Sequence, residues 1–307
     1  MKWMPWETIF LHRSQGLKDQ HQPLCQPLCQ PCLLYTSLPA DLFDKYNADN
    51  MIGMVEKAND MGVKMLINFE KRPEFLDLEM RKALYYAINR QAVVEKVYRG
   101  MGAVGSAGYA PEGSIYFNEN CEKYDYNPET AKKAFAEKNL SINLIAANSG
   151  NDVKIAELIK LDLEAAGIKV NVTTYDSAVR DEMINNGTYE FALVGNGGWG
   201  GKAPAYMRTI FSDISKNKGG NPHSMGPIGY SNAKITELAE AQALETDFNK
   251  RIEIFKELQL EVSREVPLVV VATQSSYSMY RKDYYDGWMK TYDYQQAEQN
   301  RLSYIQR

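Results

Sequence analysis

The 307-residue sequence predicts an α/β fold. Strand-like alternation and helix-like periodicity succeed one another between Leu140 and Val194, in the order strand, helix, strand, helix, strand. Two βαβ units in series imply parallel central strands with right-handed crossovers. The composition, 44% hydrophobic and 24% charged, is that of a globular protein, and the length suggests two domains.

The first strongly periodic element is a helix that Asp77 caps. Its apolar residues recur at every third or fourth position through Met80–Tyr98, and Gly100 follows them. This pattern predicts one continuous helix that stops at the glycine. A second helix is expected over residues 127–138, because its proline stands at the first helical position, where the missing N–H costs nothing.

The same criteria predict the remaining elements in chain order. We expect strands at Leu140–Ala146, Ile168–Thr174, Tyr189–Val194 and Pro267–Thr273, and helices at Asp152–Ala166, Asp176–Asn186, Asn232–Glu245 and Asp247–Arg264. A further helix begins near Pro204, and the segment Tyr277–Tyr294 is rich in aromatic residues.

Charge and hydropathy exclude several classes of protein. The chain has 35 basic and 39 acidic residues, a net charge of −4, and it lacks the basic stripe that nucleic-acid binding needs. Its longest apolar run, Val266–Ala272, is far shorter than the roughly 20 residues of a membrane span. Glu7 and Arg13 interrupt the one candidate export signal, so we expect no signal sequence in this chain.

The N-terminal segment 1–37 differs from the rest of the chain. It contains the duplicated tract Gln22–Cys29 and prolines at close intervals, which prevent a helix or a central strand. The stretch Cys32–Ser37 resembles translated sequencing-adaptor read-through. We therefore expect segment 1–37 to be non-native or disordered.

Two motifs favour an enzyme as the alternative function. Cys25, Cys29 and Cys32 have the spacing of the cluster-binding cysteines of radical S-adenosylmethionine enzymes, but no strand precedes them. Gly195–Gly200 matches the glycine pattern of nicotinamide-dependent enzymes, but no second strand with an acidic residue follows. Outside segment 1–37, His and Cys do not occur at zinc-ligand spacing, so we expect no metal site and no catalytic residue.

The glycine-rich loop after the Tyr189–Val194 strand is the best candidate ligand site. In open α/β sheets, ligands bind beyond the carboxyl ends of the strands, and glycines let the main chain approach them closely. We therefore expect Asn196, Gly197, Gly198 and Trp199 to contact a ligand, with Trp199 as the stacking anchor.

Several stretches, in this order along the chain, carry a family resemblance. They include Phe75–Asp77 leading into Arg81–Arg90, then Tyr124–Pro128, Tyr189–Leu193 and Gly229–Asn232. From Leu38 onward the chain resembles the C-terminal half of a family 5 extracellular solute-binding protein, a receptor of ABC importers for peptides, nickel complexes or oligosaccharides.

The resemblance implies a periplasmic-binding-protein-like (class II) fold with a mixed sheet and flanking helices. Residues 70–265 would form the second ligand-binding lobe. Residues 38–69 would supply a first-lobe and hinge remnant, and 266–307 would return to the first lobe. The implied function is capture of a small solute between two lobes and delivery to the permease, without enzymatic chemistry or a cofactor.

The resemblance also adds site residues. Tyr109 matches a position facing the cleft, and Gln274 at the end of the last strand is a further candidate. Where the peptide-binding branch has an aspartate for the peptide's ammonium group, this chain has Trp199. The implied parent protein is periplasmic or at the cell surface, and we expect a monomer.

Overall fold

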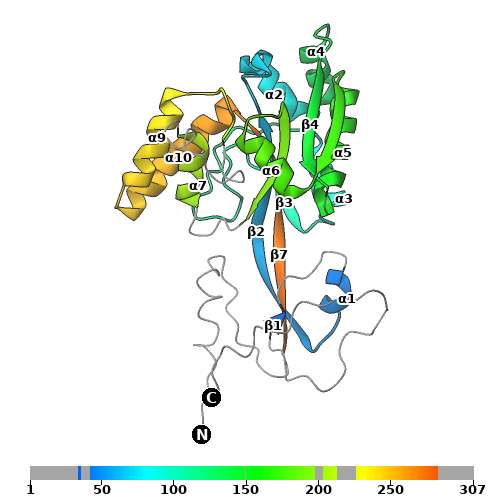
Figure 1. Cartoon of the computed structure of the whole chain (residues 1–307). Coiled ribbons are helices and arrows are strands. Elements are labelled where there is room, and N and C mark those ends of the chain that lie inside the picture. The colour runs from blue at the N-terminus through cyan, green and yellow to red at the C-terminus, as the bar shows by residue number, and fades with distance from the viewer. Residues whose placement is uncertain (1–33, 36–41, 149, 198–202, 213–225, 283–307) are drawn as a thin grey trace.

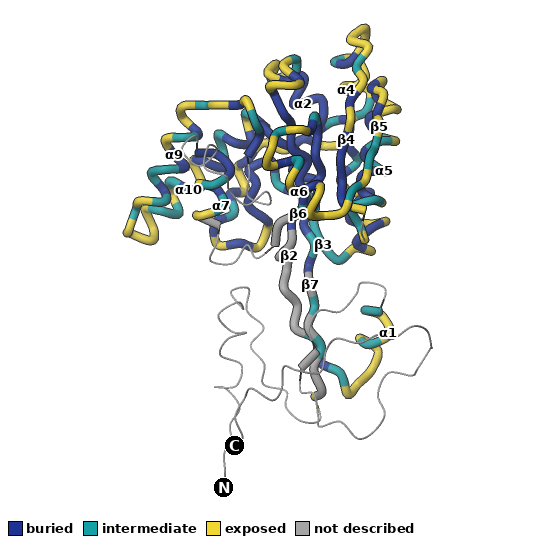
Figure 2. The backbone as a smooth tube through the Cα atoms, in the orientation of Figure 1, coloured by how far each residue is buried: buried dark blue, intermediate teal, exposed yellow. Residues whose placement is uncertain are grey.

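The computed structural model describes residues 34–35, 42–148, 150–197, 203–212 and 226–282, and the structural statements below concern these residues. They form an α/β body from which two long strands extend (Figure 1). Most of the buried residues lie in the body (Figure 2). The α/β prediction is confirmed.

The sheet has seven strands, in the order β1-β7-β2-β6-β4-β5, and β3 pairs with β7 outside this path. Pairing is parallel between β4 and its neighbours β5 and β6, and antiparallel elsewhere, so the sheet is mixed. The strands are β1 Leu34–Tyr35, β2 Ile52–Ile67, β3 Gly102–Val104, β4 Ser141–Ala147, β5 Lys169–Tyr175, β6 Phe191–Gly197 and β7 Val269–Arg281.

Helices cover both faces of the body part of this sheet (Figure 1). The helices are α1 Phe43–Asn47, α2 Leu78–Ala87, α3 Arg90–Lys96, α4 Pro128–Phe135, α5 Gly150–Ala165, α6 Ser177–Asn185, α7 Ala203–Phe211, α9 Ala233–Leu244 and α10 Phe248–Glu265, with the short 3-10 turn η3 Pro73–Leu76. None of the described helices is long and apolar enough to cross a membrane.

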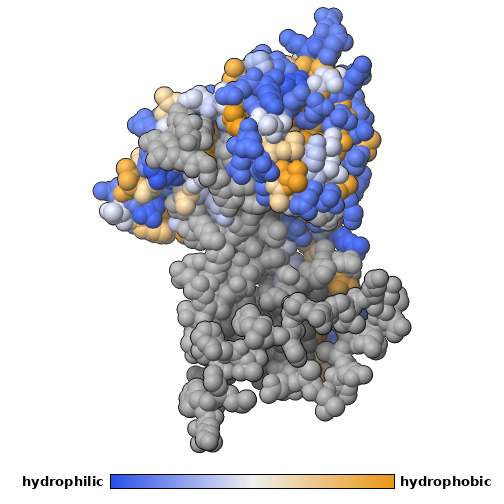
Figure 3. All heavy atoms as spheres, in the orientation of Figure 1, coloured by the Kyte–Doolittle hydropathy of each residue, from blue (hydrophilic) through white to orange (hydrophobic). Residues whose placement is uncertain are grey.

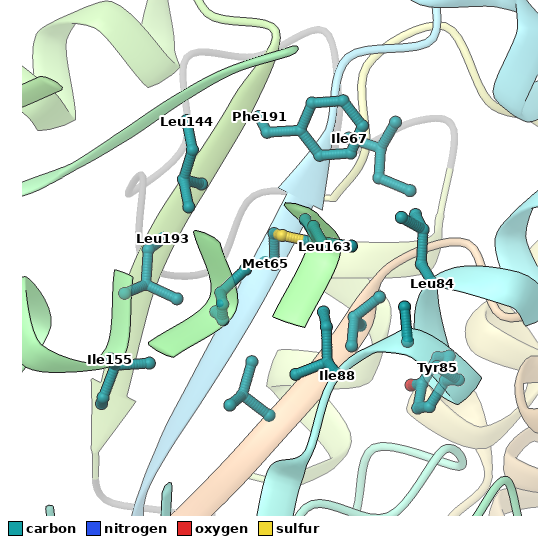
Figure 4. Close-up of a cluster of buried hydrophobic side chains, with 14 of the residues drawn as sticks. Met65, Ile67, Leu84, Tyr85, Ile88, Leu144, Ile155, Leu163, Phe191 and Leu193 are labelled. Atoms are coloured by element: carbon teal, nitrogen blue, oxygen red, sulfur yellow. The ribbon is translucent and has the colours of Figure 1, made fainter. Parts of the chain in front are cut away.

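The core is divided into two clusters by the sheet. Successive strand side chains point to opposite faces, so Met65 and Ile67 of β2 enter the cluster beneath α2, α4 and α5, whereas Leu66 enters the cluster beneath α6, α7, α9 and α10. Phe191 and Leu193 of β6 join Met65 in the first cluster (Figure 4). Figure 3 shows that the outer surface of the body is mainly hydrophilic on the viewed face.

The predicted βαβ units are confirmed. In β4, Ile142 lies opposite Val170 of β5, and Leu144 lies opposite Phe191 of β6, both in parallel register. Parallel neighbours need a crossover, which α5 and α6 provide. Alternating apolar residues were sufficient to predict β4 and β5, whereas β6 is a continuous apolar run because its residues enter both core clusters.

The prediction of a single helix from Asp77 to Tyr98 is wrong. Asp77 does cap α2, accepting a hydrogen bond from the Glu79 N–H at 2.9 Å, but the helix ends at Ala87. Asn89 then starts α3: its side chain accepts from the Ala92 N–H at 3.0 Å. Its own N–H donates to Asp162 of α5 at 2.8 Å, so the break ties two helices together.

The two longest strands, β2 and β7, extend beyond the body as an antiparallel ribbon (Figure 1). At Met61, the neighbouring strand β6 ends with Gly197, and β3 starts at Gly102 opposite Gln274 of β7. Just beyond, the register between β2 and β7 shifts between Lys57 and Met61. The predicted strand Pro267–Thr273 was therefore too short, because β7 continues along β2.

The far end of the ribbon includes part of segment 1–37. Leu34 and Tyr35 form β1, in antiparallel register with Tyr280 and Met279 of β7. The last part of the segment expected to be non-native or disordered thus pairs with β7, and the boundary at residue 37 stays a prediction. Residues 1–33 lie outside the described residues, so the expectation for them is untested.

Asn89→Ala removes the side-chain cap of α3. We expect it to lower the free energy of unfolding by about 1 kcal/mol, because a helix N–H loses its acceptor. Urea unfolding followed by circular dichroism measures this. Asn186→Ala, at the exposed C-terminal end of α6, is the control and should change stability by less than about 0.5 kcal/mol. Equal losses in the two variants would contradict the capping role.

Candidate ligand-binding site

Three of the predicted ligand residues meet at one level of the sheet. Asn196 and Gly197 end β6 opposite Gly62 and Met61 of β2, and Gln274 of β7 lies opposite Met61 on the other side. Because β6 runs parallel to β4, this level is the carboxyl end of a parallel strand, where ligands bind in α/β sheets. β6 continues beyond the predicted strand end at Val194, so Asn196 and Gly197 lie in the strand and not in a loop.

The loop that follows β6 carries the other two predicted contacts. Gly198 and Trp199 lie outside the described residues, so their roles stay predictions. Helix α7 begins at Ala203, in agreement with the helix expected near Pro204.

Tyr109 lies in the segment after β3 and is only 2% exposed. Its φ is +77°, a left-handed conformation that a bulky side chain rarely adopts. Its ring packs edge-on against Phe211 of α7, with ring centroids 5.8 Å apart. The loop is thus held in a strained form with Tyr109 turned into the second core cluster, rather than open to solvent.

The partner of Tyr109 is Lys64 of β2. The Lys64 Nζ donates a hydrogen bond of 2.8 Å to the Tyr109 hydroxyl oxygen. Lys64 is 1% exposed, and this burial lowers the pKa of its amino group to about 7. Burial also raises the pKa of the Tyr109 hydroxyl well above its ordinary value. A buried lysine is rare because desolvation opposes its charge, and such groups are concentrated at functional sites.

Sequence reasoning missed Lys64, although a signal was present. The residue interrupts an otherwise apolar run, Val63–Ile67, in a strand that is buried on both faces. A charge within such a run contradicts the binary pattern and marks a candidate site. The strand itself had no alternation to reveal it, because a strand buried on both faces reads as a continuous apolar run.

Comparison with models of known protein families shows which family this chain belongs to. Residues 33–218 match the family described as bacterial extracellular solute-binding proteins, family 5 Middle. The chain belongs to this family.

Individual members of family 5 align over most of the chain. The dipeptide-binding protein of Escherichia coli is 26% identical over 254 residues, which is 80% of this chain and 46% of that protein. The peptide transport periplasmic protein SapA of Haemophilus influenzae is 29% identical over 217 residues, 68% of this chain and 37% of that protein. The chain thus spans less than half the length of these curated relatives.

Solved structures share the fold. The ABC transporter-associated periplasmic binding protein DppA from Helicobacter pylori, in complex with the peptide STSA, superposes with a TM-score of 0.71 and 18% identity, covering 84% of this chain and 50% of that one. A dipeptide-binding protein from Pseudoalteromonas sp. SM9913, in complex with Met-Leu, has a TM-score of 0.65 and 22% identity, covering 79% and 48%. The expected periplasmic-binding-protein-like fold is confirmed.

The Arg81–Arg90 element, the most specific part of the resemblance, has a structural role in this family 5 chain. Arg81 donates to the main-chain oxygen of Glu265 at 2.8 Å and to its carboxylate at 3.1 Å. Arg90 donates to the carbonyl oxygens of Gly105 and Tyr124, at 2.7 and 2.5 Å. Arg90 thereby fixes both ends of the loop that contains Tyr109.

This loop also borders a cavity of about 390 Å³. Polar residues dominate its lining, among them Arg90, Ser106, Glu112, Asn118, Cys121 and Asp125. Tyr109 and Gln274 are not among the described residues that line it.

Neither enzyme motif receives support. Cys25, Cys29 and Cys32 lie outside the described residues. Cys121, inside them, is buried, and burial raises the pKa of its thiol to about 11, so it is a poor nucleophile at neutral pH. Within the described ranges, no three His, Cys, Asp or Glu side chains gather to hold a metal ion.

The buried Lys64 predicts how stability depends on pH. Its pKa is about 7 in the native state and about 10.5 in the unfolded chain, so between these values the unfolded state binds more protons. We expect this residue to make the free energy of unfolding rise by on the order of 2 kcal/mol from pH 7 to pH 9. Urea unfolding at several pH values measures the slope.

Lys64→Met should flatten this rise and increase stability at pH 6, where the native state must hold a buried ammonium. Lys169→Met, on the exposed edge strand β5, is the matched control and should keep the wild-type slope. An unchanged slope in Lys64→Met would show that the buried amino group is not the source.

Proposed function

We propose that this chain provides the second lobe of a solute-binding protein that captures a small solute and delivers it to an ABC permease. One observation carries the proposal: Gly197 and Gln274 lie on either side of Met61, and Asn196 lies opposite the adjacent Gly62, at the carboxyl end of a parallel strand. Family membership supports it, since the matched family consists of extracellular solute-binding proteins.

We assign the two lobes from the place where β6 and β3 end and the sheet continues as the β2–β7 ribbon. The body, residues 70–265 together with the parts of β2 and β7 that it encloses, is the second lobe. The ribbon segments in 38–69 and 266–307 lead into the first lobe. The solute would be bound between the lobes, which approach one another as in other hinged binding proteins.

A short peptide is the ligand class that we favour. The names of relatives support it, because a dipeptide-binding protein and a peptide transport protein are among them, and two structural neighbours are complexes with STSA and Met-Leu. A metal complex is the second candidate, because another neighbour holds Ni(L-His). An oligosaccharide is the third, because Trp199 could stack on a sugar ring.

Location and partners follow from the same proposal. The mature parent would work in the periplasm or at the cell surface, as a monomer, with permease subunits as its partners. Capture of a solute between two lobes needs no cofactor and no covalent chemistry.

Calorimetric titration of the chain tests the proposed function. The probes are Met-Leu, Ser-Thr-Ser-Ala, Ni(L-His) and maltotriose, each at up to 1 mM. We expect saturable binding of a peptide, with a melting temperature that rises with peptide concentration, because a ligand that binds only the native state stabilises it. Binding of Ni(L-His) or maltotriose alone would replace the peptide by that class, and binding of none would contradict the function.

Trp199→Ala tests the proposed anchor. Loss of a stacked indole should weaken peptide binding by about two orders of magnitude, while the melting temperature without ligand changes little. Calorimetry measures both quantities. A large fall in melting temperature with unchanged affinity would make Trp199 a core residue instead.

A further inference from the structure

Among the described residues, Arg90 is the one buried arginine that forms no ion pair. It is 8% exposed and lies in the wall of the cavity of about 390 Å³. The other buried arginines each pair with a carboxylate at 2.6 to 3.3 Å: Arg72 with Glu74 and Glu190, Arg81 with Glu265, and Arg180 with Asp152 and Asp181. Desolvation opposes an unpaired buried charge, so the exception at Arg90 indicates a place for an anionic group.

The contacts of Arg90 leave part of its guanidinium unused. Its two terminal nitrogens donate to the carbonyl oxygens of Gly105 and Tyr124, at 2.7 and 2.5 Å. The guanidinium also lies over the ring of Tyr85, 4.8 Å from the ring centroid, so its orientation is fixed. A guanidinium has five N–H donors, and within the described part of the chain three of them have no acceptor. One of the three is on Nε, which is not fully enclosed by protein.

The other described residues that line the cavity all lie in segment 104–125, and hydrogen bonds attach this segment to α10. The Asn118 Nδ2 donates to the Lys256 carbonyl oxygen at 2.7 Å. The Tyr124 hydroxyl donates to the Ser263 carbonyl oxygen at 2.9 Å. The cavity is therefore preformed, and its volume lies in the range of small-molecule sites.

The same cavity has exposed charged residues in its lining. They are Glu112, Glu119, Glu122, Lys123 and Asp125. With Arg90 included, the described lining has four acidic and two basic residues, a surplus of two negative charges. This surplus disfavours a purely anionic ligand, whereas the unpaired Arg90 disfavours a purely cationic one. A ligand that carries both charges satisfies the two requirements.

We infer that this cavity is a second binding site, which takes a small zwitterion with a carboxylate and an ammonium group. The carboxylate accepts hydrogen bonds from Arg90, and the ammonium lies among the acidic residues of the lining. Each charge of the ligand then meets an opposite charge of the wall. The inference goes beyond the proposed function and does not depend on it.

Calorimetric titration at pH 7 tests the inference. The probes are glycine, 3-aminopropionate and 4-aminobutyrate, which hold the two charges at increasing separation, each at up to about 10 mM. The acid and the amine of the same chain length, each with one charge, are the matched controls. We expect at least one zwitterion to bind saturably and at least about tenfold more tightly than its single-charge controls, because both charges form charge-assisted hydrogen bonds.

Variants of both charged parts of the wall locate the bound zwitterion. Arg90→Gln should weaken its binding at least about tenfold, and circular dichroism verifies that this variant is folded. Because Arg90 also fixes the loop, the double variant Glu122→Gln, Asp125→Asn provides a second measurement at exposed positions. It should weaken binding of the zwitterion severalfold without weakening that of the acid. Glu164→Gln, exposed on α5 and outside the described lining, is the control and should change neither affinity.

Three results would overturn the inference. The first is the absence of saturable binding by all three zwitterions, or binding no tighter than that of the single-charge controls. The second is unchanged binding in the exposed double variant or in folded Arg90→Gln. The third is displacement of the zwitterion by saturating Met-Leu, because both would then occupy one site. Failure of Met-Leu itself to bind would contradict the proposed peptide binding alone, since the titrations of the zwitterions do not require it.

Discussion

The pairing of β2 on both of its edges is the constraint on which the rest of the structure depends. This strand joins β6 on one side and β7 on the other, and its alternating side chains enter both core clusters. A slip of one residue would move Met65 and Leu66 to the wrong faces and would carry Lys64 into the other cluster. The register of β2 therefore fixes the core and the candidate site together.

The buried arginines of the Arg81–Arg90 element hold the neighbouring loops in place by donating to main-chain oxygens. Arg81 joins α2 to the end of α10, where Glu265 also accepts a hydrogen bond from the Tyr230 hydroxyl at 2.9 Å. Arg90 holds the two ends of the segment that carries Tyr109. Each guanidinium is largely buried and donates to main-chain oxygens, so its charge is compensated by dipoles that fix the path of the chain.

Local patterns predicted the elements whose signals are local. The strands β4 and β5 needed only alternation, β6 only a short apolar run, and the helices that begin after Asp176 and Asp247 only a cap within a few residues. The break at Asn89 was missed because the apolar spacing continues through it, and the contact with Asp162 is distant in sequence. The length of β2 and β7, and the approach of Lys64 to Tyr109, depend on pairing between remote segments, which no single window of sequence contains.

The ribbon has a mechanical consequence. Where β6, β2, β7 and β3 lie side by side, bending across the strands must deform every ladder of hydrogen bonds at once. Beyond Met61 only β2 and β7 continue, and their irregular register there leaves fewer bonds to resist. The sheet therefore becomes less stiff at Met61. A force on the far end of the ribbon would bend it there, beside Gly197 and Gln274. The place where the sheet narrows therefore coincides with the proposed ligand contacts, and the proposed site lies where the ribbon can bend most easily.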